Sequence, residues 1–425
     1  MDIAIVGGGI AGLSTYLHLR KHLPNPSAHT ITIYESHRPR AKLLSNIPQA
    51  QNATQSLNLD TLSISTAIVG GGLGISPNGM RVLRDLDPEL HDRVVAQGFP
   101  ADNFVFKGAN GWTLGVQSTS DKAIKGEGEA EEYVKEKGGD NVVKFAKVLG
   151  IEGHEGNGRL QVRVQVEEGR EEMIEADLVI GADGVKSEVR KATISLDLSE
   201  LMLVSGQSGV GGFLTSAIPS FVTTNKAMVF GFGGNGFFGY SSGGPPATQQ
   251  LMWWSTFETS NLPDTKVVDP AAIKVALLQR HKHWKDPIIQ EIVQKAEVES
   301  IYPTWTLPTL PHWGTRGIVL VGDAAHAMDP TTGQGASQAL EDSQTLALLL
   351  AELSKEVAKD DDEATARKTI DQSIKIFHEI RSPRINAIVE RGKKIAGRKA
   401  NVGIVAEYFM YCFLWLLNKF PAIGE

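Results

Sequence analysis

Cysteine and long runs of like charge are almost absent from this chain of 425 residues. The single cysteine, Cys412, excludes an internal disulfide and any metal site built from several cysteines. A net charge of −7 without a long basic run argues against nucleic acid as a partner. His281 and His283 lie close together without acids at ligand spacing, so we expect both to be solvated and no metal to be bound.

Room for a cleavable signal is also missing, because an apolar, strand-like run begins at Asp2. We therefore expect a cytoplasmic protein. The composition, with 41% hydrophobic and 21% charged residues, is that of an ordinary globular protein. The length suffices for two substantial hydrophobic cores, or for one discontinuous domain with a second inserted into it.

A glycine-rich segment follows directly on this first apolar run. Gly7, Gly9 and Gly12 have the spacing of the dinucleotide fingerprint. In that motif the first glycine permits a tight turn, the second lets a pyrophosphate approach the backbone, and the third lets the next helix pack closely. The helix expected from Ala11 to about Arg20 would direct its free N–H groups at the phosphates.

A second apolar strand, residues 30–34, ends in Glu35, about 20 residues beyond the glycines. An acid at this position accepts hydrogen bonds from the adenosine ribose hydroxyls. These two features indicate a dinucleotide site, but they do not distinguish FAD from NAD.

A later segment makes that distinction. Residues 318–321 form another apolar run that leads into Gly322 and Asp323, and we expect Asp323 to bind a ribityl hydroxyl. A middle segment ending in Asp183 and Gly184 repeats the same pattern of an apolar run followed by glycine and aspartate. Three such strand ends favour an extended molecule with two ring systems, and FAD fits best.

The third segment continues through Pro330 and Gly333 into an amphipathic helix that starts near Gly335 and Ala336. Amides at this helix start would hold the electron-rich edge of a flavin ring, and they would stabilise the negative charge that reduction places there.

With these motifs the chain resembles the single-component FAD-dependent aromatic hydroxylases, which include p-hydroxybenzoate, salicylate and 6-hydroxynicotinate hydroxylases. The resemblance covers roughly residues 1–40, 66–118 and 140–400. It extends to a glycine-rich stretch in which Gly71 and Gly72 would lie beside the flavin.

The resemblance implies an α/β fold: a discontinuous Rossmann-like FAD-binding domain, an inserted mixed β-sheet substrate domain, and C-terminal helices. The expected boundaries are 1–190 for the first part of the FAD domain, with an insertion at 45–66, then 191–300 for the substrate domain. The second part of the FAD domain would be 301–355, and the C-terminal helical region 356–425.

The resemblance also implies a mechanism. NAD(P)H, bound transiently, reduces the flavin, which then captures O2 as a C4a-hydroperoxide that hydroxylates or epoxidises the substrate. Pro330 would lie near this adduct. We expect the aromatic strands at 227–257 to line the substrate pocket, with Tyr240 as a catalytic candidate and Phe238, Trp253 and Trp254 as further lining residues.

The substrate domain is poor in arginine, with Arg280 alone between residues 191 and 300. Because a carboxylate is normally bound by a guanidinium, we expect a neutral aromatic or polycyclic substrate. Two alternatives stay open: another FAD-dependent oxidoreductase, such as a reductase or a halogenase, and a relative with impaired FAD binding.

The apolar tail at 402–420 also has two interpretations. It is a helix packed on the protein or at a dimer interface, or it contacts a membrane surface. The oligomeric state, the substrate and the catalytic base are not determined by the sequence.

One departure from the family pattern concerns the pyrophosphate. Residues 94–158 contain no arginine, although family members have one there that reaches the FAD pyrophosphate. Lys122 and Lys125 offer only point charges in its place. The stretch just after Lys125 is instead acidic, with Glu127, Glu129, Glu131 and Glu132.

We therefore predict that FAD is lost more readily as ionic strength rises, because salt screens the attraction between a surface lysine and the pyrophosphate. Flavin retention on gel filtration at low and high salt measures this. Tight retention at both would show that another cation, such as Arg38 or Lys42, has replaced the arginine.

Overall fold

The computed structural model describes residues 1–37, 74–123, 142–153, 159–166, 169–194, 203–258, 269–298, 301–357, 363–396 and 403–419. Gly71 and Gly72, the insertion at 45–66 and the four glutamates near Lys125 lie outside these ranges, so the expectations for them stay predictions. Arg38 and Lys42 also lie outside.

A six-stranded sheet forms the first half of the molecule, in the order β15-β16-β9-β1-β2-β5. Every neighbouring pair is parallel except β15–β16. Its central strands are continuous apolar runs because both faces are covered. The strands are β1 (Asp2–Val6), β2 (Thr30–Glu35), β5 (Val143–Phe145), β9 (Leu178–Gly181), β15 (Gly314–Thr315) and β16 (Ile318–Leu320).

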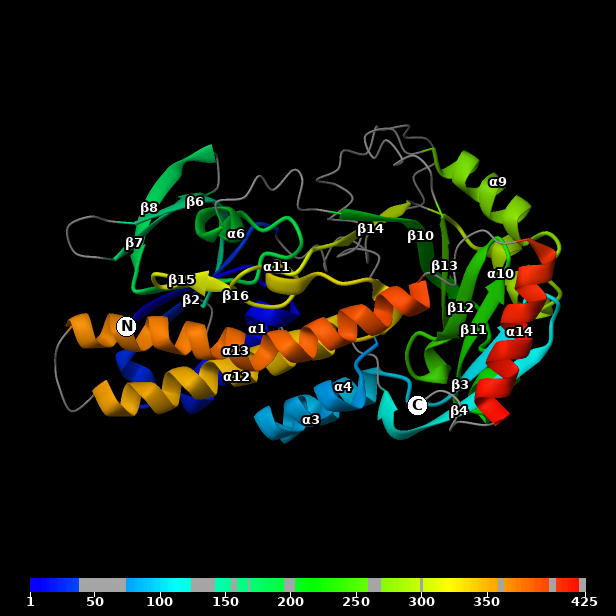
Figure 1. Cartoon of the computed structure of the whole chain (residues 1–425), viewed down its shortest axis with the longest axis horizontal. Helices are drawn as coiled ribbons and strands as arrows, with labels where there is room; N and C mark the ends of the chain where they lie inside the picture. Colours follow the sequence, from blue (N-terminus) through cyan, green and yellow to red (C-terminus); the bar gives the residue numbers. More distant parts are fainter. Residues whose placement is uncertain are drawn as a thin grey trace.

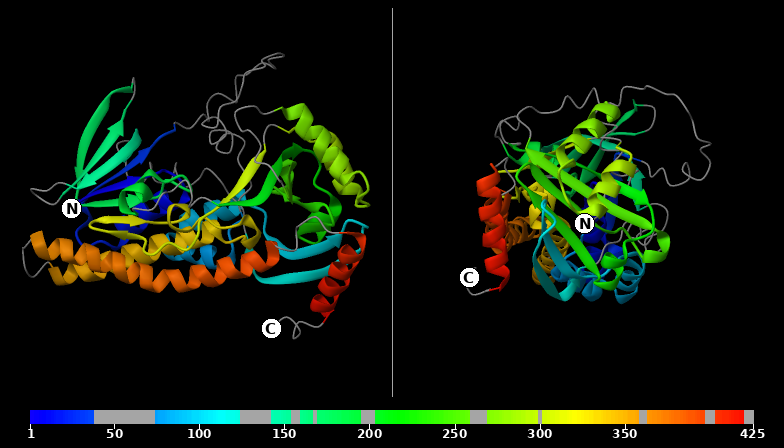
Figure 2. Two further views of the ribbon diagram at one scale, coloured as in Figure 1. Left: turned by 45° about the horizontal axis from the view of Figure 1, so that its top comes forward. Right: turned by 90° about the vertical axis from the view of Figure 1, so that its right-hand side faces the viewer.

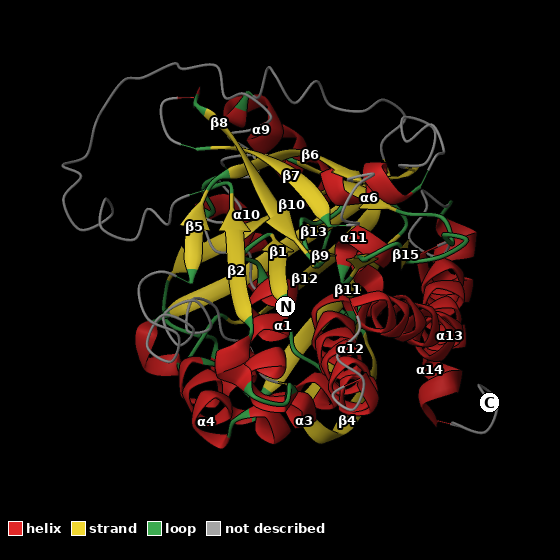
Figure 3. Ribbon diagram, turned by 90° about the vertical axis from the view of Figure 1, so that its left-hand side faces the viewer, coloured by secondary structure: helices red, strands yellow, loops and turns green. Residues whose placement is uncertain are grey.

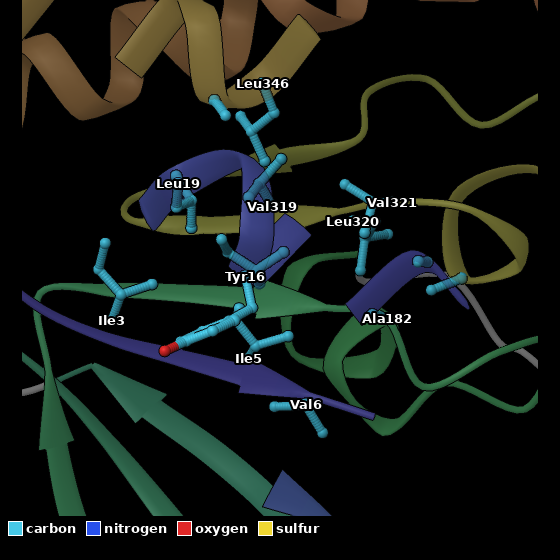
Figure 4. Packing of buried hydrophobic residues seen from close by; sticks show 14 of the residues in the cluster. Ile3, Ile5, Val6, Tyr16, Leu19, Ala182, Val319, Leu320, Val321 and Leu346 are labelled. Atoms are coloured by element: carbon cyan, nitrogen blue, oxygen red, sulfur yellow. The ribbon is translucent and has the colours of Figure 1, made fainter. Parts of the chain in front are cut away.

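Helices cover one face of this sheet and a small antiparallel sheet covers the other (Figures 1 and 3). The helices are α1 (Ile10–His22), α12 (Gly335–Val357) and α13 (Glu363–Ala396), and the small sheet is formed by β6 (Lys147–Gly153), β7 (Leu160–Gln165) and β8 (Glu171–Ala176). Figure 4 shows the core between sheet and helices, with Tyr16 of α1 beside Ile5 of β1 and Leu346 of α12 beside Val319.

A seven-stranded mixed sheet forms the second half, in the order β14-β10-β13-β12-β11-β3-β4. Only β11 and β3 pair in parallel. The sheet reaches beyond the expected 191–300 in both directions, since β3, β4 and β14 belong to it. Its strands are β3 (Ala101–Gly108), β4 (Thr113–Ala123), β10 (Leu203–Thr215), β11 (Ala227–Gly233), β12 (Gly236–Ser242), β13 (Gln250–Glu258) and β14 (Tyr302–Thr306).

The two faces of the seven-stranded sheet differ in what covers them. Helices α9 (Pro270–His281) and α10 (Pro287–Lys295) lie on the face that is turned away from the six-stranded sheet (Figure 1). His281 at the end of α9 is fully buried there, with its ring edge-on to Phe238 at 5.0 Å between ring centroids. The expectation that His281 is solvated is therefore wrong, because α9 packs its last turn into the core.

The described chain has further helices besides those that cover the two large sheets. Asp87 caps one of them, α4, by accepting hydrogen bonds from the N–H groups of Glu89 and Leu90. These helices are α3 (Pro77–Leu86), α4 (Pro88–Gln97), α6 (Glu188–Thr193), α8 (Ser220–Thr224), α11 (Asp323–His326) and α14 (Ile404–Lys419).

Candidate functional site

The turn from β1 into α1 has the close contacts that its glycines permit. Gly7 has φ of +104°, and a Cβ on it would collide with the carbonyl of Ala182 at the end of β9. A Cβ on Gly12 would collide with the carbonyl oxygen of Gly7. Gly9 is different, because no atom lies within 4 Å of the place where its Cβ would be. The turn therefore leaves open space where the fingerprint expects a phosphate.

The start of α1 is suited to an anion. Its N-cap is Gly9, which has no side chain to bond the first amides, and its first turn holds no acidic residue. These N–H groups and the positive end of the helix dipole face the open space beside Gly9. The observed residues therefore fit the pyrophosphate of FAD.

Glu35 ends β2 next to this turn. The N–H of Gly8 donates a hydrogen bond of 2.6 Å to Glu35 Oε2, and the N–H of His37 donates one of 2.8 Å to Oε1. The side chain stays partly exposed, so further lone pairs of its oxygens can accept from a ribose hydroxyl. Its contact with the ribose remains a prediction.

Asp183 follows β9 and holds the start of α6. Its carboxylate accepts hydrogen bonds from the Ser187 hydroxyl, at 2.5 Å, and from the N–H groups of Glu188 and Val189. Burial raises the pKa of Asp183, and these hydrogen bonds oppose the rise. Both carboxylate oxygens thus have partners within the protein, and a contact of Asp183 with FAD stays a prediction.

Arg190 links this second motif to the third. It lies on α6 and is fully buried, and its guanidinium donates a hydrogen bond of 2.9 Å to the carbonyl of Ala324 in α11. The second and third motifs are thereby held against each other.

Gly322 and Asp323 lie beside the first motif. Gly322 has φ of +59°, and a Cβ on it would lie 3.0 Å from the side chain of Ala11 in α1 and 3.3 Å from that of Ala339 in α12. Its N–H donates a hydrogen bond of 2.9 Å to Asp342 Oδ2. Small residues at these positions therefore let α1, α11 and α12 meet at one point.

Asp323 lies at the start of α11. Its side chain is exposed to solvent, although protein atoms surround much of its carboxylate. Its Oδ1 lies 4.0 Å from where a Cβ on Gly335 would be, so the carboxylate faces the start of α12. Desolvation by the surrounding protein raises the pKa of Asp323, while His326 lowers it and Asp342 raises it further.

The segment that leads into α12 is bonded to the start of α3. The N–H of Ser76 donates to Ser337 Oγ at 2.9 Å, and the Ser76 hydroxyl donates to the carbonyl of Gly333 at 3.0 Å. Pro330 begins the 3₁₀ helix η4 (Pro330–Thr332), which ends at Gly333 with φ of +58°. Pro330 and Gly333 are exposed, and Gly335 and Ala336 are partly exposed.

The three motifs thus meet at the carboxyl ends of β1, β9 and β16, which is where open parallel sheets bind their ligands. Among the described residues, no group of three or more His, Cys, Asp or Glu is arranged to hold a metal ion.

Tyr240 does not lie where the sequence placed it. It is fully buried on the helix-covered face of the seven-stranded sheet, and its hydroxyl donates a hydrogen bond of 3.1 Å to Asp286 at the start of α10. Phe238 and Trp253 share this face, since Tyr240 is paired with Trp253 and strand residues alternate between faces. The assignment of Tyr240 as catalytic is therefore corrected: it belongs to the core.

Sequence reasoning missed the buried charges behind the third motif. Asp342 on α12 accepts from His326 Nε2 at 2.6 Å and from Arg381 Nε of α13 at 2.8 Å. Arg381 also bonds Glu341 at 2.6 Å. An acidic pair within an otherwise amphipathic helix was the available signal, but its basic partner lies about 40 residues away in the sequence.

A family model described as the FAD binding domain matches residues 65–372. This match spans well over half of the chain, so the chain belongs to that family. It confirms the resemblance to FAD-dependent hydroxylases and FAD as the expected cofactor.

Relatives of this chain include enzymes named as monooxygenases, and together with the FAD-binding family this makes the protein an FAD-dependent monooxygenase. Aurachin C monooxygenase/isomerase of Stigmatella aurantiaca is 28% identical over 83% of this chain and 81% of its own length. Zeaxanthin epoxidase of Nicotiana plumbaginifolia is 30% identical over 54% of this chain, and the aligned part is 32% of that relative. The chain thus spans most of the bacterial relative but about a third of the epoxidase.

Solved structures share the fold at low sequence identity. HpxO of Klebsiella pneumoniae, crystallised with FAD and uric acid, has a TM-score of 0.71 at 16% identity, over 98% of this chain and 92% of its own. A salicylate hydroxylase in complex with its substrate has a TM-score of 0.66 at 17% identity, over 93% of this chain and 87% of its own.

Two glycine substitutions separate folding from cofactor binding. We predict that Gly12→Ala destabilises the apoprotein by about 1–3 kcal/mol, because its methyl group overlaps a backbone oxygen that has little freedom to move. Gly9→Ala should leave the thermal midpoint of the apoprotein unchanged but lower its flavin content, because its methyl group enters the open phosphate space. Full flavin occupancy in Gly9→Ala would contradict the assigned phosphate position.

A substitution at Asp323 should affect stability and cofactor affinity in opposite directions. Its raised pKa means that the ionised carboxylate disfavours the folded apoprotein, a cost that appears as pH rises from 3.8 through the folded pKa. We predict that Asp323→Asn raises the thermal midpoint of the apoprotein at pH 7 but not in acid. It should weaken FAD binding by about 2 kcal/mol through loss of a charged acceptor. Unchanged FAD affinity by fluorescence titration would show that Asp323 does not touch the cofactor.

Proposed function

We propose that this protein uses FAD, NAD(P)H and O2 to hydroxylate or epoxidise a neutral aromatic or polycyclic small molecule. When bound, FAD would supply the redox and oxygen chemistry. The protein's own residues would bind the cofactor, orient the substrate and exclude water. The use of NAD(P)H would suit the expected cytoplasmic location.

One observation carries the proposed substrate class, namely a continuous aromatic surface on the open face of the seven-stranded sheet. Phe230 lies at its centre, with ring centroids 5.4 to 6.0 Å from those of four other aromatic side chains. Together with Phe232, whose ring centroid is 5.3 Å from that of Phe237, these form what we call the aromatic face: Phe104, Phe106, Phe230, Phe232, Phe237 and Trp254.

The register of the strands supports this assignment. Phe230 is paired with Gly239, and Trp254 is paired with the same glycine from the other side. A Cβ on Gly239 would collide with the Trp254 ring, so the glycine lets the indole lie flat across β12. All but Phe237 remain partly exposed, and alternation along the strands places them on the face opposite that of Tyr240 and the helices α9 and α10.

Arg280 and Lys107, two cations of this domain, lie away from the aromatic face. Arg280 is on α9, and its guanidinium lies 3.4 Å from the centroid of the Phe257 ring. Lys107 points to the same helix-covered face and forms an ion pair of 2.8 Å with Asp286. A substrate carboxylate on the aromatic face would therefore meet neither of these cations, which favours a neutral substrate.

Epoxidation is as compatible with the site as hydroxylation. Thr331 and Thr332 follow Pro330, and the Thr331 hydroxyl donates to the carboxylate of Asp329. No strong base stands at this position to deprotonate a phenol. One relative, zeaxanthin epoxidase, is named for epoxidation, which supports keeping that reaction in the proposal.

The decisive experiment is a substrate screen. We predict that neutral aromatic and polycyclic compounds stimulate NAD(P)H oxidation, with O2 uptake and incorporation of one oxygen atom, more strongly than salicylate or p-hydroxybenzoate. Stimulation by the carboxylates alone would refute the neutral class. NAD(P)H oxidation without oxygen incorporation would favour a reductase instead.

A substitution tests whether the best substrate from this screen binds at the aromatic face. Phe230→Ala should raise KM for the best substrate about tenfold, the equivalent of about 1.4 kcal/mol, with flavin content unchanged. Ile380→Ala, at an exposed apolar position on α13, is the matched control and should change neither value. An unaltered KM in Phe230→Ala would place the substrate elsewhere.

A further inference from the structure

Helix α14 is fixed to the protein along one side. Tyr411 is almost fully buried, and its ring lies against Gly108. Its hydroxyl accepts a hydrogen bond of 2.8 Å from the N–H of Ala109 and lies 2.8 Å from the carbonyl oxygen of Phe232. Glu407, one turn earlier, is bonded to the same hydroxyl. The one acidic side chain of α14 is therefore turned inward.

The opposite side of α14 is apolar and exposed. Phe409 has 74% of its surface exposed and Phe413 has 42%. The exposed positions follow one helical stripe, in pairs separated by four residues, as expected for a single helix face. We call this stripe the outer face: Ile404, Val405, Tyr408, Phe409, Cys412, Phe413 and Leu416.

Neighbouring aromatic residues enlarge the outer face. Trp112, at the turn between β3 and β4, is exposed and packs edge-on against Tyr408, with ring centroids 5.7 Å apart. Trp415 is also exposed, and the ammonium group of Lys419 lies 5.2 Å from the centroid of its ring. A contiguous apolar surface of this kind marks an interaction site on a protein.

The length of α14 decides between crossing a bilayer and lying on it. The helix has 16 residues, whereas about 20 apolar residues are needed to span the hydrocarbon core. Among the described helices, none is long and apolar enough to cross a membrane. An exposed apolar stripe with Trp, Tyr and Phe is instead typical of a helix that lies in the membrane interface.

The basic residues that precede α14 indicate that the lipid headgroups it meets are anionic. The sequence between Arg391 and Lys399 carries five basic residues and no acid, and it immediately precedes α14. Arg391 and Lys393 are exposed on the last turns of α13, where Lys393 forms an ion pair of 2.8 Å with Glu390. Figure 2 shows α13 and α14 along the same flank, with α14 at the outer edge of the molecule. A basic segment next to an apolar helix attracts anionic lipids, even though the chain as a whole has a net charge of −7.

We propose that the outer face of α14 docks this enzyme on the surface of a lipid bilayer with anionic headgroups. The helix lies parallel to the surface, with its aromatic side chains inserted at the headgroup boundary and with Arg391 and Lys393 of α13 on the phosphates and carboxylates of the lipids. This inference is independent of the proposed substrate, since it concerns a surface and not the cofactor site.

Cys412, the single cysteine of the chain, lies on the outer face and serves as the reporter. The FAD-loaded protein is labelled at Cys412 with an environment-sensitive fluorophore and mixed with vesicles of phosphatidylcholine, with or without phosphatidylserine. We expect a blue shift with the anionic vesicles that high salt diminishes. A label on Val275→Cys in the Cys412→Ser background, at an exposed apolar position of α9, should not respond.

Flotation with the same vesicles tests which residues of the outer face and of α13 contribute to membrane binding. Phe409→Ser combined with Phe413→Ser should reduce binding at least tenfold, with flavin content unchanged because both side chains face outward. Val275→Ser is the matched control. Arg391→Gln and Lys393→Gln should each weaken binding to anionic vesicles about fivefold.

Two results would overturn the proposal. One is failure of the unmodified protein to bind anionic vesicles at low salt. The other is a dimer in light scattering that the double Phe→Ser variant converts to a monomer without any vesicle binding, which would make the outer face an interface between two copies. Neither result depends on whether the proposed substrate class is correct.

Discussion

The buried carboxylate of Asp342 holds the cofactor side of this protein together. It accepts hydrogen bonds from the backbone of Gly322, from His326 and from Arg381. Burial by itself would raise the pKa of Asp342, but His326 and Arg381 outweigh burial and lower it. Removal of one partner from such a buried group typically costs about 3–5 kcal/mol. Asp342 therefore fixes the turn at Gly322, α12 and α13 to one another as one unit.

That fixed unit positions a site made chiefly of backbone. The glycines of the three motifs permit close contacts between α1, α11 and α12, and they leave open space where FAD would bind. Glu35, Asp183 and Asp323 are the ionisable residues that the sequence pointed to, and each lies at a strand end. An arrangement of this kind lets the protein bind a dinucleotide largely through N–H groups, whose positions are set by the fold.

The two faces of the seven-stranded sheet have different roles: one packs against helices, and the other is the face on which we propose that substrate binds. The helix-covered face contains Tyr240, Asp286 and Lys107, a bonded group that secures α10 to the sheet. The opposite face is aromatic around Phe230, and this difference underlies the proposed neutral substrate. Docking through α14 would bring such an enzyme close to lipophilic compounds that partition into membranes, which accords with the apolar character of the aromatic face.

The sequence by itself determined the cofactor and the fold, because glycine spacing and strand-end acids are local signals whose geometry allows few alternatives. It located Gly7, Gly12 and Gly322 at turns where the structure shows close contacts. Only the tertiary structure decided which aromatic residues face outward. Alternation along a strand gives two equivalent faces, and the packing of α9 and α10 buried Tyr240 on one of them. The Asp342–Arg381 pair likewise required the fold, since nothing local links residues on separate helices.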